Sequence, residues 1–189
     1  MGILHSVLRK LFPPRIEPLS EVQSGEIVTI RGRVVERDLL TSPLNGARCV
    51  YYQYTIEQWR KSHLAGFATE GYWDRLEKDE AIAEFYIQDG QTRAIIAPHR
   101  AHIEPGPGIT HNRIPLDIAF PVQRASQLII APGDLVEITG IAEQTLDQHN
   151  AQLAYRASPD HVIIAAPANR QLLIRLIQSA TPSTGTDNV

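Results

Sequence analysis

The chain has 189 residues, of which 43% are hydrophobic and 21% are charged, and its formal net charge at pH 7 is -3. This length and composition predict one folded domain with an ordinary core and exclude a fibrous or wholly disordered protein. The single cysteine excludes an intrachain disulfide and a cysteine-rich zinc module. The slight negative charge disfavours nucleic-acid binding, because that affinity depends mainly on neutralising phosphates.

An amphipathic helix is predicted near the N-terminus. Within residues 1–24, apolar side chains recur at helical spacing over residues 3–12, and Pro13 and Pro14 end the pattern before a proline-rich linker. We expect this helix to pack on the domain or to contact a membrane surface or a partner. The sequence shows no secretory h-region and no apolar stretch long enough to span a bilayer. These features predict a cytoplasmic protein and leave peripheral membrane association through the helix open.

Alternating apolar and polar residues predict antiparallel strands from Gly25 onward. The clearest patterns, in chain order, are EIVTIRGRVVE (26–36), CVYYQYTIEQW (49–59), AIAEFYIQ (81–88), TRAIIAP (92–98) and LVEITGIAE (135–143). Asp89 and Gly90 predict a hairpin turn between the third and fourth of these. The pattern dissolves over residues 61–80, which we interpret as an irregular excursion between strands. A closing strand or strand pair is expected within residues 152–165.

Gly32 and Gly140 each interrupt one of these strands, which indicates a bulge or a close backbone approach. Together with the order of the strands, this predicts an all-β fold, a small OB-like barrel of five or six strands over residues 25–167. Residues 168–180 are predicted to form a short amphipathic helix, so that a short helix lies at each end of the barrel. Residues 181–189 are polar and are predicted to be a disordered tail.

The strand segments also resemble a known family. They occur in the order RGRVV (31–35), LTSPLNGARCVYYQY (40–54), FYIQDGQTRAIIAP (85–98) and SQLIIAPGDLVEITGIAE (126–143). In that order they resemble the GIDE domain, also called the BAM ("beside a membrane") domain, which is found in the mitochondrial ubiquitin ligase MULAN and in many prokaryotic proteins. The resemblance covers roughly residues 25–165, and its most specific part is Ser42-Pro43-Leu44 followed by CVYY.

Two departures from the family limit what the resemblance implies. Ligase members carry a RING finger, which needs a set of cysteine and histidine zinc ligands. One cysteine cannot supply that set, so ubiquitin-ligase activity is not expected here. Family members also usually flank the domain with transmembrane helices, and none is predicted in this sequence. The resemblance therefore implies a non-catalytic recognition or scaffolding module whose expected partner is a protein.

The sequence gives little support for catalysis. His99, His102 and His111 lie in a proline- and glycine-rich loop with Glu104, a set that suits zinc or another borderline metal. Loop histidines are more commonly solvated, however, and no nucleophile–base motif accompanies them. We predict no metal, no cofactor and no enzymatic activity. An uncharacterised enzyme using the His99/His102 loop is the second alternative.

Cys49 and the turn aspartates have simpler interpretations. Cys49 opens an aromatic strand, which favours a buried small apolar side chain over a nucleophile. Asp89 and Asp134 lie in turns, where aspartate accepts hydrogen bonds from local backbone amides.

Aromatic and basic residues concentrate in one third of the chain and predict a binding face. OB barrels use such faces to stack bases and contact phosphates, so single-stranded nucleic-acid binding is the first alternative to a protein-binding module. A solvated strand face with ordinary cross-strand pairs is the simpler interpretation. The candidate binding residues are Arg31, Arg33, Arg48, Tyr52, Trp59, Phe67, Tyr72 and Trp73.

Overall fold

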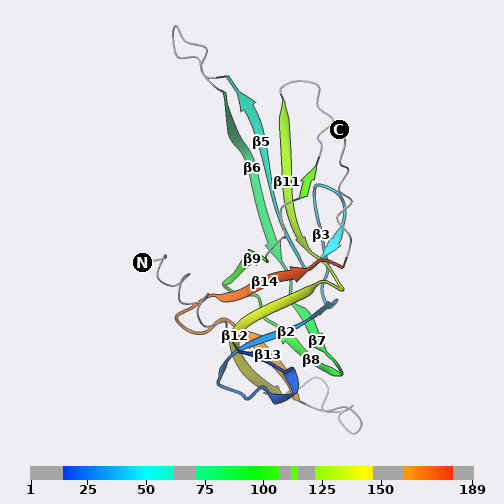
Figure 1. Ribbon diagram of the computed structural model, residues 1–189, viewed down its shortest axis with the longest axis vertical. Coiled ribbons are helices and arrows are strands. Elements are labelled where there is room, and N and C mark those ends of the chain that lie inside the picture. The colour runs from blue at the N-terminus through cyan, green and yellow to red at the C-terminus, as the bar shows by residue number, and fades with distance from the viewer. Residues whose placement is uncertain (1–14, 62–70, 107–111, 115–121, 147–159, 181–189) are drawn as a thin grey trace.

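The computed structural model describes residues 15–61, 71–106, 112–114, 122–146 and 160–180 (Figure 1). The predicted N-terminal helix and the predicted disordered tail lie outside these residues. Within them the chain is all-β apart from one 3-10 turn. The elements are β1 (Ile16–Glu17), η1 (Leu19–Glu21), β2 (Ile27–Val35), β3 (Leu40–Thr41), β4 (Arg48–Cys49), β5 (Tyr51–Arg60), β6 (Tyr72–Ile82), β7 (Phe85–Asp89), β8 (Thr92–Ile96), β9 (Ala101–Pro105), β10 (Asn112–Ile114), β11 (Gln123–Ile130), β12 (Leu135–Leu146), β13 (Asp160–Ala165) and β14 (Leu172–Gln178).

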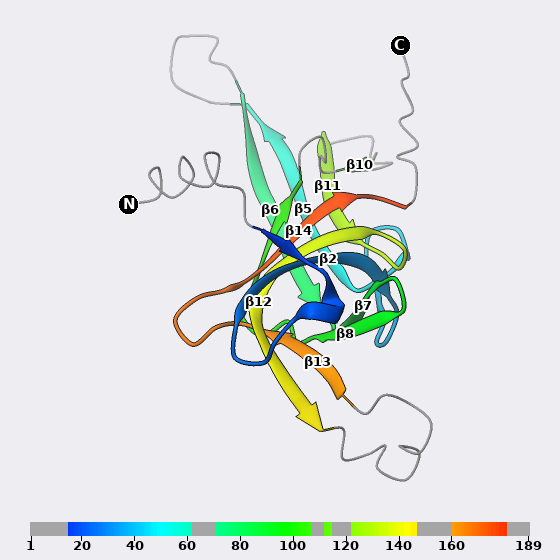
Figure 2. The same ribbon diagram turned by 60° about the horizontal axis from the view of Figure 1, so that its bottom comes forward.

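Five strands close into a barrel (Figure 2). β2 pairs with β7, and β7 pairs with β8, both antiparallel. β8 pairs in parallel with β13, which pairs with β12, and β12 returns to β2. Alternate residues point inward along each strand, as the period of two requires. The fully buried interior includes Ile30, Phe85, Ile87, Ile96, Ile138 and Ile164.

The barrel confirms the predicted strands around Gly32, the Asp89-Gly90 hairpin and Gly140. Gly90 has a φ of 59°, the left-handed conformation that its turn requires. The register between β2 and β12 runs without a shift past both mid-strand glycines. Neither glycine marks a bulge. Each instead allows a close approach, because a Cβ at Gly32 would lie 2.8 Å from the Gln88 carbonyl oxygen.

The predicted helix over residues 168–180 is wrong, because β14 is a strand. It pairs with the first half of β12 and, in parallel, with β9, so it belongs to the barrel sheet. Leu172, Ile174 and Leu176 are buried, and the residues between them are half-buried. A short apolar run fits both the helical and the strand period. The free edges of β12 and β9 decide the outcome, because β14 satisfies the backbone groups of both.

A four-stranded antiparallel sheet projects from the barrel (Figure 1). Its order is β10-β11-β5-β6, and we call it the arm. β5 and β6 are inserted between β2 and β7, whereas β10 and β11 are inserted between β9 and β12. Tyr51 and Ile130 pair at the base of the arm, where both are buried in the barrel core. Two excursions that are distant in the sequence therefore form one projecting element.

The arm also corrects the prediction of an irregular excursion over residues 61–80, because residues 72–82 form β6. β6 is an edge strand whose residues 74–80 are exposed or half-buried, and six of those seven side chains are charged. The register between β5 and β6 shifts next to Ile56, which leaves Leu76 as an extra residue in a bulge. Charges and a bulge are typical of an edge strand. They also hide the alternation by which strands are predicted.

Candidate interaction surface

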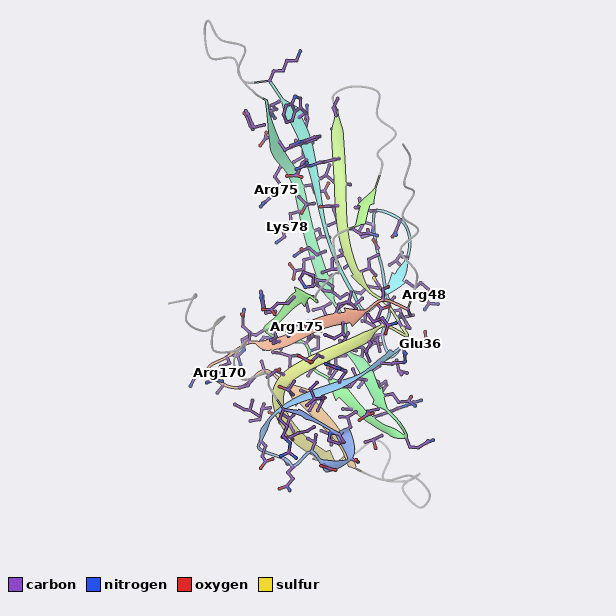
Figure 3. The ribbon with its side chains drawn as sticks, viewed as in Figure 1. Glu36, Arg48, Arg75, Lys78, Arg170 and Arg175 are labelled. Atoms are coloured by element: carbon purple, nitrogen blue, oxygen red, sulfur yellow. The ribbon has the colours of Figure 1, made fainter. Side chains whose placement is uncertain are left out.

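The predicted aromatic–basic face does not form one surface. Arg31 and Arg33 lie on β2 of the barrel, and Arg48 lies on β4. The candidate aromatic residues of the described chain lie on the arm instead, where Tyr52 is near the barrel and Trp59 and Trp73 pair near the far end. Phe67 lies outside the described residues. Figure 3 labels Arg48 beside the base of the arm and Arg175 on the barrel.

Arg31 belongs to a ladder of ion pairs across the outer face of the barrel. Its guanidinium lies 2.9 Å from one Glu137 oxygen, and Arg175 lies 3.4 Å from the other. Arg175 also lies 2.9 Å from Glu104, which in turn lies 3.7 Å from His102. The ladder runs from β2 through β12 and β14 to β9. Arg31 therefore links β2 to β12. Because Glu137 neutralises part of its positive charge, Arg31 is a weaker binding group for a ligand.

Arg33 lies beside an open groove on the barrel. Its Nη1 donates to the Gly133 carbonyl oxygen at 2.9 Å. The groove has a volume of about 710 Å³, and Arg31, Arg33, Glu17 and Asp89 are its charged lining residues. Two basic and two acidic side chains balance one another. The groove therefore lacks the positive potential that a nucleic-acid backbone requires.

Two tyrosines on the near part of the arm bind acidic residues of β6. The Tyr52 hydroxyl donates to Asp79 at 3.0 Å, and the Tyr54 hydroxyl donates to Glu77. The hydrogen bond to Glu77 raises the pKa of Tyr54 to about 12, because it stabilises the neutral phenol. The side chain of Tyr54 is buried, so this pair fixes the register of β5 against β6.

We expect this pair to stabilise the protein until the phenol ionises. Because the folded pKa of Tyr54 is raised from 10.0 to about 12, the contribution is complete below about pH 10 and is lost as the pH rises through 12. Glu77→Gln should move one tyrosine of the tyrosinate absorbance titration to lower pH. Glu84→Gln, a change at an exposed glutamate that pairs with Arg37, should leave the curve unchanged. Identical curves for wild type and Glu77→Gln would contradict the assignment.

The far end of the arm carries an aromatic cluster. Trp59 and Trp73 pair directly across β5 and β6, with ring centroids 5.3 Å apart in an edge-to-face arrangement. The Arg124 guanidinium lies 4.1 Å above the Trp73 ring and 2.7 Å from Glu57. A Cβ at Gly71 would lie 2.4 Å from the Trp59 ring, so the glycine makes room for the indole. Trp59 remains 37% exposed.

Tyr72 and Val122 extend this cluster. Tyr72 pairs with Arg60 on the opposite face of the sheet from the tryptophans and is 54% exposed. Val122 is 50% exposed, and its carbonyl oxygen accepts a hydrogen bond from the Trp59 amide. Arg60 is held 2.7 Å from Asp74. We define the arm-end cluster as Trp59, Tyr72, Trp73, Val122 and Arg124.

The sequence prediction missed two members of the arm-end cluster, Val122 and Arg124. Both belong to the end of the segment that pairs with β5, more than sixty positions away in the chain. No local pattern carries that pairing. The only signal is the apolar run that becomes β11, which indicates a strand but not its neighbour.

The histidines and the cysteine that the sequence offers for catalysis are not assembled into a metal-binding group within the described part of the chain. His99 and His102 are exposed, and His111 lies outside the described residues. No group of three or more histidine, cysteine, aspartate or glutamate side chains in the described part of the chain could hold a metal ion. Cys49 is buried, and burial raises the pKa of its thiol, which disfavours the reactive thiolate.

Comparison with family models and with curated proteins gives no match for the chain. The resemblance to the GIDE/BAM domain therefore stays a prediction. The described residues include no helix that is long and apolar enough to cross a membrane.

Proposed function

We propose that the protein is a non-catalytic binding module in which an OB-type barrel of the GIDE/BAM kind carries a projecting arm. The strand order supports the OB assignment. Counted along the barrel, the strands neighbour one another as first, second, third, fifth and fourth, and the third and fifth, β8 and β13, are parallel. This order supports the assignment to a five-stranded Greek-key barrel of the OB type.

The arm-end cluster is the observation that carries the functional proposal. Tryptophan, tyrosine and arginine are the residues that most often dominate binding energy at interfaces. Here they gather at the end of an element that contributes its base, but not its end, to the core. Trp59 lies roughly 27 Å along β5 from Tyr51, at about 3.4 Å per residue. Exposing the apolar surface of these rings to water is unfavourable, and so far from the core the rings do not stabilise the barrel in return. Their position therefore supports a role in binding.

A protein partner is the expectation that the sequence favours, and a cytoplasmic location goes with it. Binding of single-stranded nucleic acid has less support. Arg31 and Arg33 are paired on the barrel, whereas the exposed rings lie on the arm. Bases stacked on the rings would therefore not place their phosphates beside these arginines. Two of the basic residues that do lie near the rings, Arg60 and Arg124, are each paired with a carboxylate at 2.7 Å.

Photo-crosslinking in the native cell tests the proposal without assuming the class of partner. A benzophenone amino acid replaces Trp59 or Tyr72 in the full chain, and Ile27, which is 53% exposed on the barrel, serves as the matched control position. We expect protein or lipid adducts from positions 59 and 72 and few from position 27. Adducts from position 27 alone would contradict the assignment of binding to the arm.

A further inference from the structure

We propose that the arm-end cluster binds the interfacial region of an anionic lipid bilayer. This inference rests on the proposed function, because it names the partner of the same surface. It also differs from membrane contact through the N-terminal segment, since it places the contact on the end of the arm. Three features of the described residues support it: the rings on both faces of the sheet, the distribution of charge along the arm, and the protected edge of β6.

The exposed rings lie on both faces of the same sheet. Trp59 and Trp73 share one face, and Tyr72, the neighbour of Trp73 in β6, points to the other. A flat protein surface would cover one of these faces and leave the other in water. The headgroup region of a bilayer can surround the adjoining ends of β5 and β6 on all sides, so it buries both faces. Tryptophan and tyrosine are enriched at that depth, because the ring is apolar and its N–H or O–H stays hydrated.

The charge of the three long strands of the arm, β5, β6 and β11, changes sign along their length. Beyond the bulge, these strands and Lys61, which follows β5, carry four basic and two acidic residues, namely Arg60, Lys61, Arg75, Arg124, Glu57 and Asp74. Between the bulge and the barrel they carry one basic and three acidic residues, namely Lys78, Glu77, Asp79 and Glu80. A negatively charged surface attracts the first set and repels the second. The arm would therefore approach an anionic bilayer end-on and stop before its acidic part.

A second copy of the chain is a poorer partner for the arm. Suppose that β6 of a second copy paired antiparallel with this β6. The register that pairs most of the strand, with side chains of the same sheet face opposite one another, would place Asp74 opposite Asp79 and Arg75 opposite Lys78. Like charges directly opposite one another destabilise a sheet. The bulge at Leu76 also disrupts the regular spacing of the edge. Figure 3 shows Arg75 and Lys78 on this outer strand.

The two tryptophans of the chain are both in the cluster, so tryptophan fluorescence, excited where tyrosine does not absorb, reports on this surface alone. The full chain is titrated with vesicles of phosphatidylcholine and with vesicles that also contain phosphatidylserine. We expect the second kind to shift tryptophan emission to the blue, and lipids brominated on the acyl chain to quench it. Trp59→Phe and Trp73→Phe should each retain a shifted emission from the remaining indole.

Charge reversals at two lysines of the arm provide the matched control. Lys61→Glu, beyond the bulge, should reduce the vesicle-bound fraction roughly tenfold, because the residue lies at the anionic surface. Lys78→Glu, on the acidic part of the arm, should change it far less. Circular dichroism of both variants checks that the fold is kept.

Two outcomes would overturn this inference. One is the absence of vesicle binding, and the other is vesicle binding with unshifted, unquenched tryptophan emission, which would place the contact elsewhere on the chain. If photo-crosslinking at position 59 then gives only protein adducts, the binding module stands with a protein partner and the lipid assignment fails.

Discussion

Replacing Asp134 with alanine should destabilise the protein by about 3–5 kcal/mol, because each hydrogen bond to a buried carboxylate contributes about 1.5–3 kcal/mol. Asp134 is 1% exposed. One oxygen accepts from the Ala131 amide at 2.8 Å, and the other accepts from the Ala180 amide at 2.7 Å. The side chain therefore joins the turn before β12 to the residues that follow β14. Chemical denaturation measures the loss in unfolding free energy.

Asp89 provides the matched control for this change. It also lies at a turn, but it is exposed and accepts one long hydrogen bond, from the Leu19 amide at 3.4 Å. Asp89→Ala should therefore cost about 1 kcal/mol or less. Equal losses for the two variants would mean that the contact between Asp134 and Ala180 contributes little to the fold.

Gly140→Val should be comparably severe, with a loss of about 3 kcal/mol from overpacking. A Cβ at position 140 would lie 2.6 Å from the Ala165 carbonyl oxygen, 2.6 Å from Leu172 Cδ1 and 2.7 Å from Ile164 Cγ2. β12 changes partner here, from β14 to β13, and both strands crowd the glycine. Backbone on one side and buried side chains on the other leave no direction for relaxation.

Gly32→Val should cost less, about 1–3 kcal/mol, because the three atoms nearest the added Cβ would lie 2.8–3.3 Å away, farther than the 2.6–2.7 Å at position 140. Ile27→Val, a change at an exposed position of the same strand, is the control and should leave the melting temperature nearly unchanged. A melting temperature for Gly140→Val equal to that of wild type would show that the strands around position 140 are more loosely packed than described.

Much of the barrel is predictable from the sequence because its strands keep their own alternation. The β7–β8 hairpin has both a period of two and turn residues, and Asp134 performs the turn role that its position predicts. β14 could not be predicted, because its apolar run fits two periods and only its neighbours choose between them. β6 could not be predicted, because an edge strand covered in charges shows no alternation.

The candidate site, like the fold, could be predicted from the sequence only in part. Trp59, Tyr72 and Trp73 were predicted as binding residues, and the structure brings them together at one end of the arm. Arg31 and Arg33 were predicted on the same face, but they lie on the barrel. There Arg31 pairs with Glu137, and Arg33 donates to the Gly133 carbonyl oxygen. Arg124 replaces them beside the rings through the long-range pairing of β11 with β5. Sequence patterns can identify residues suited to binding, whereas the sheet topology decides which of them meet.

The central claim is that the barrel supplies stability and the arm-end cluster supplies binding. The most direct measurement is the unfolding free energy of the Trp59→Ala/Trp73→Ala variant. Because Trp59 is 37% exposed and Trp73 is half-buried, we predict a loss of no more than about 2 kcal/mol, well below the 3–5 kcal/mol typical of a buried tryptophan. A loss of 3–5 kcal/mol or more would show that the rings serve the fold, and it would contradict the claim.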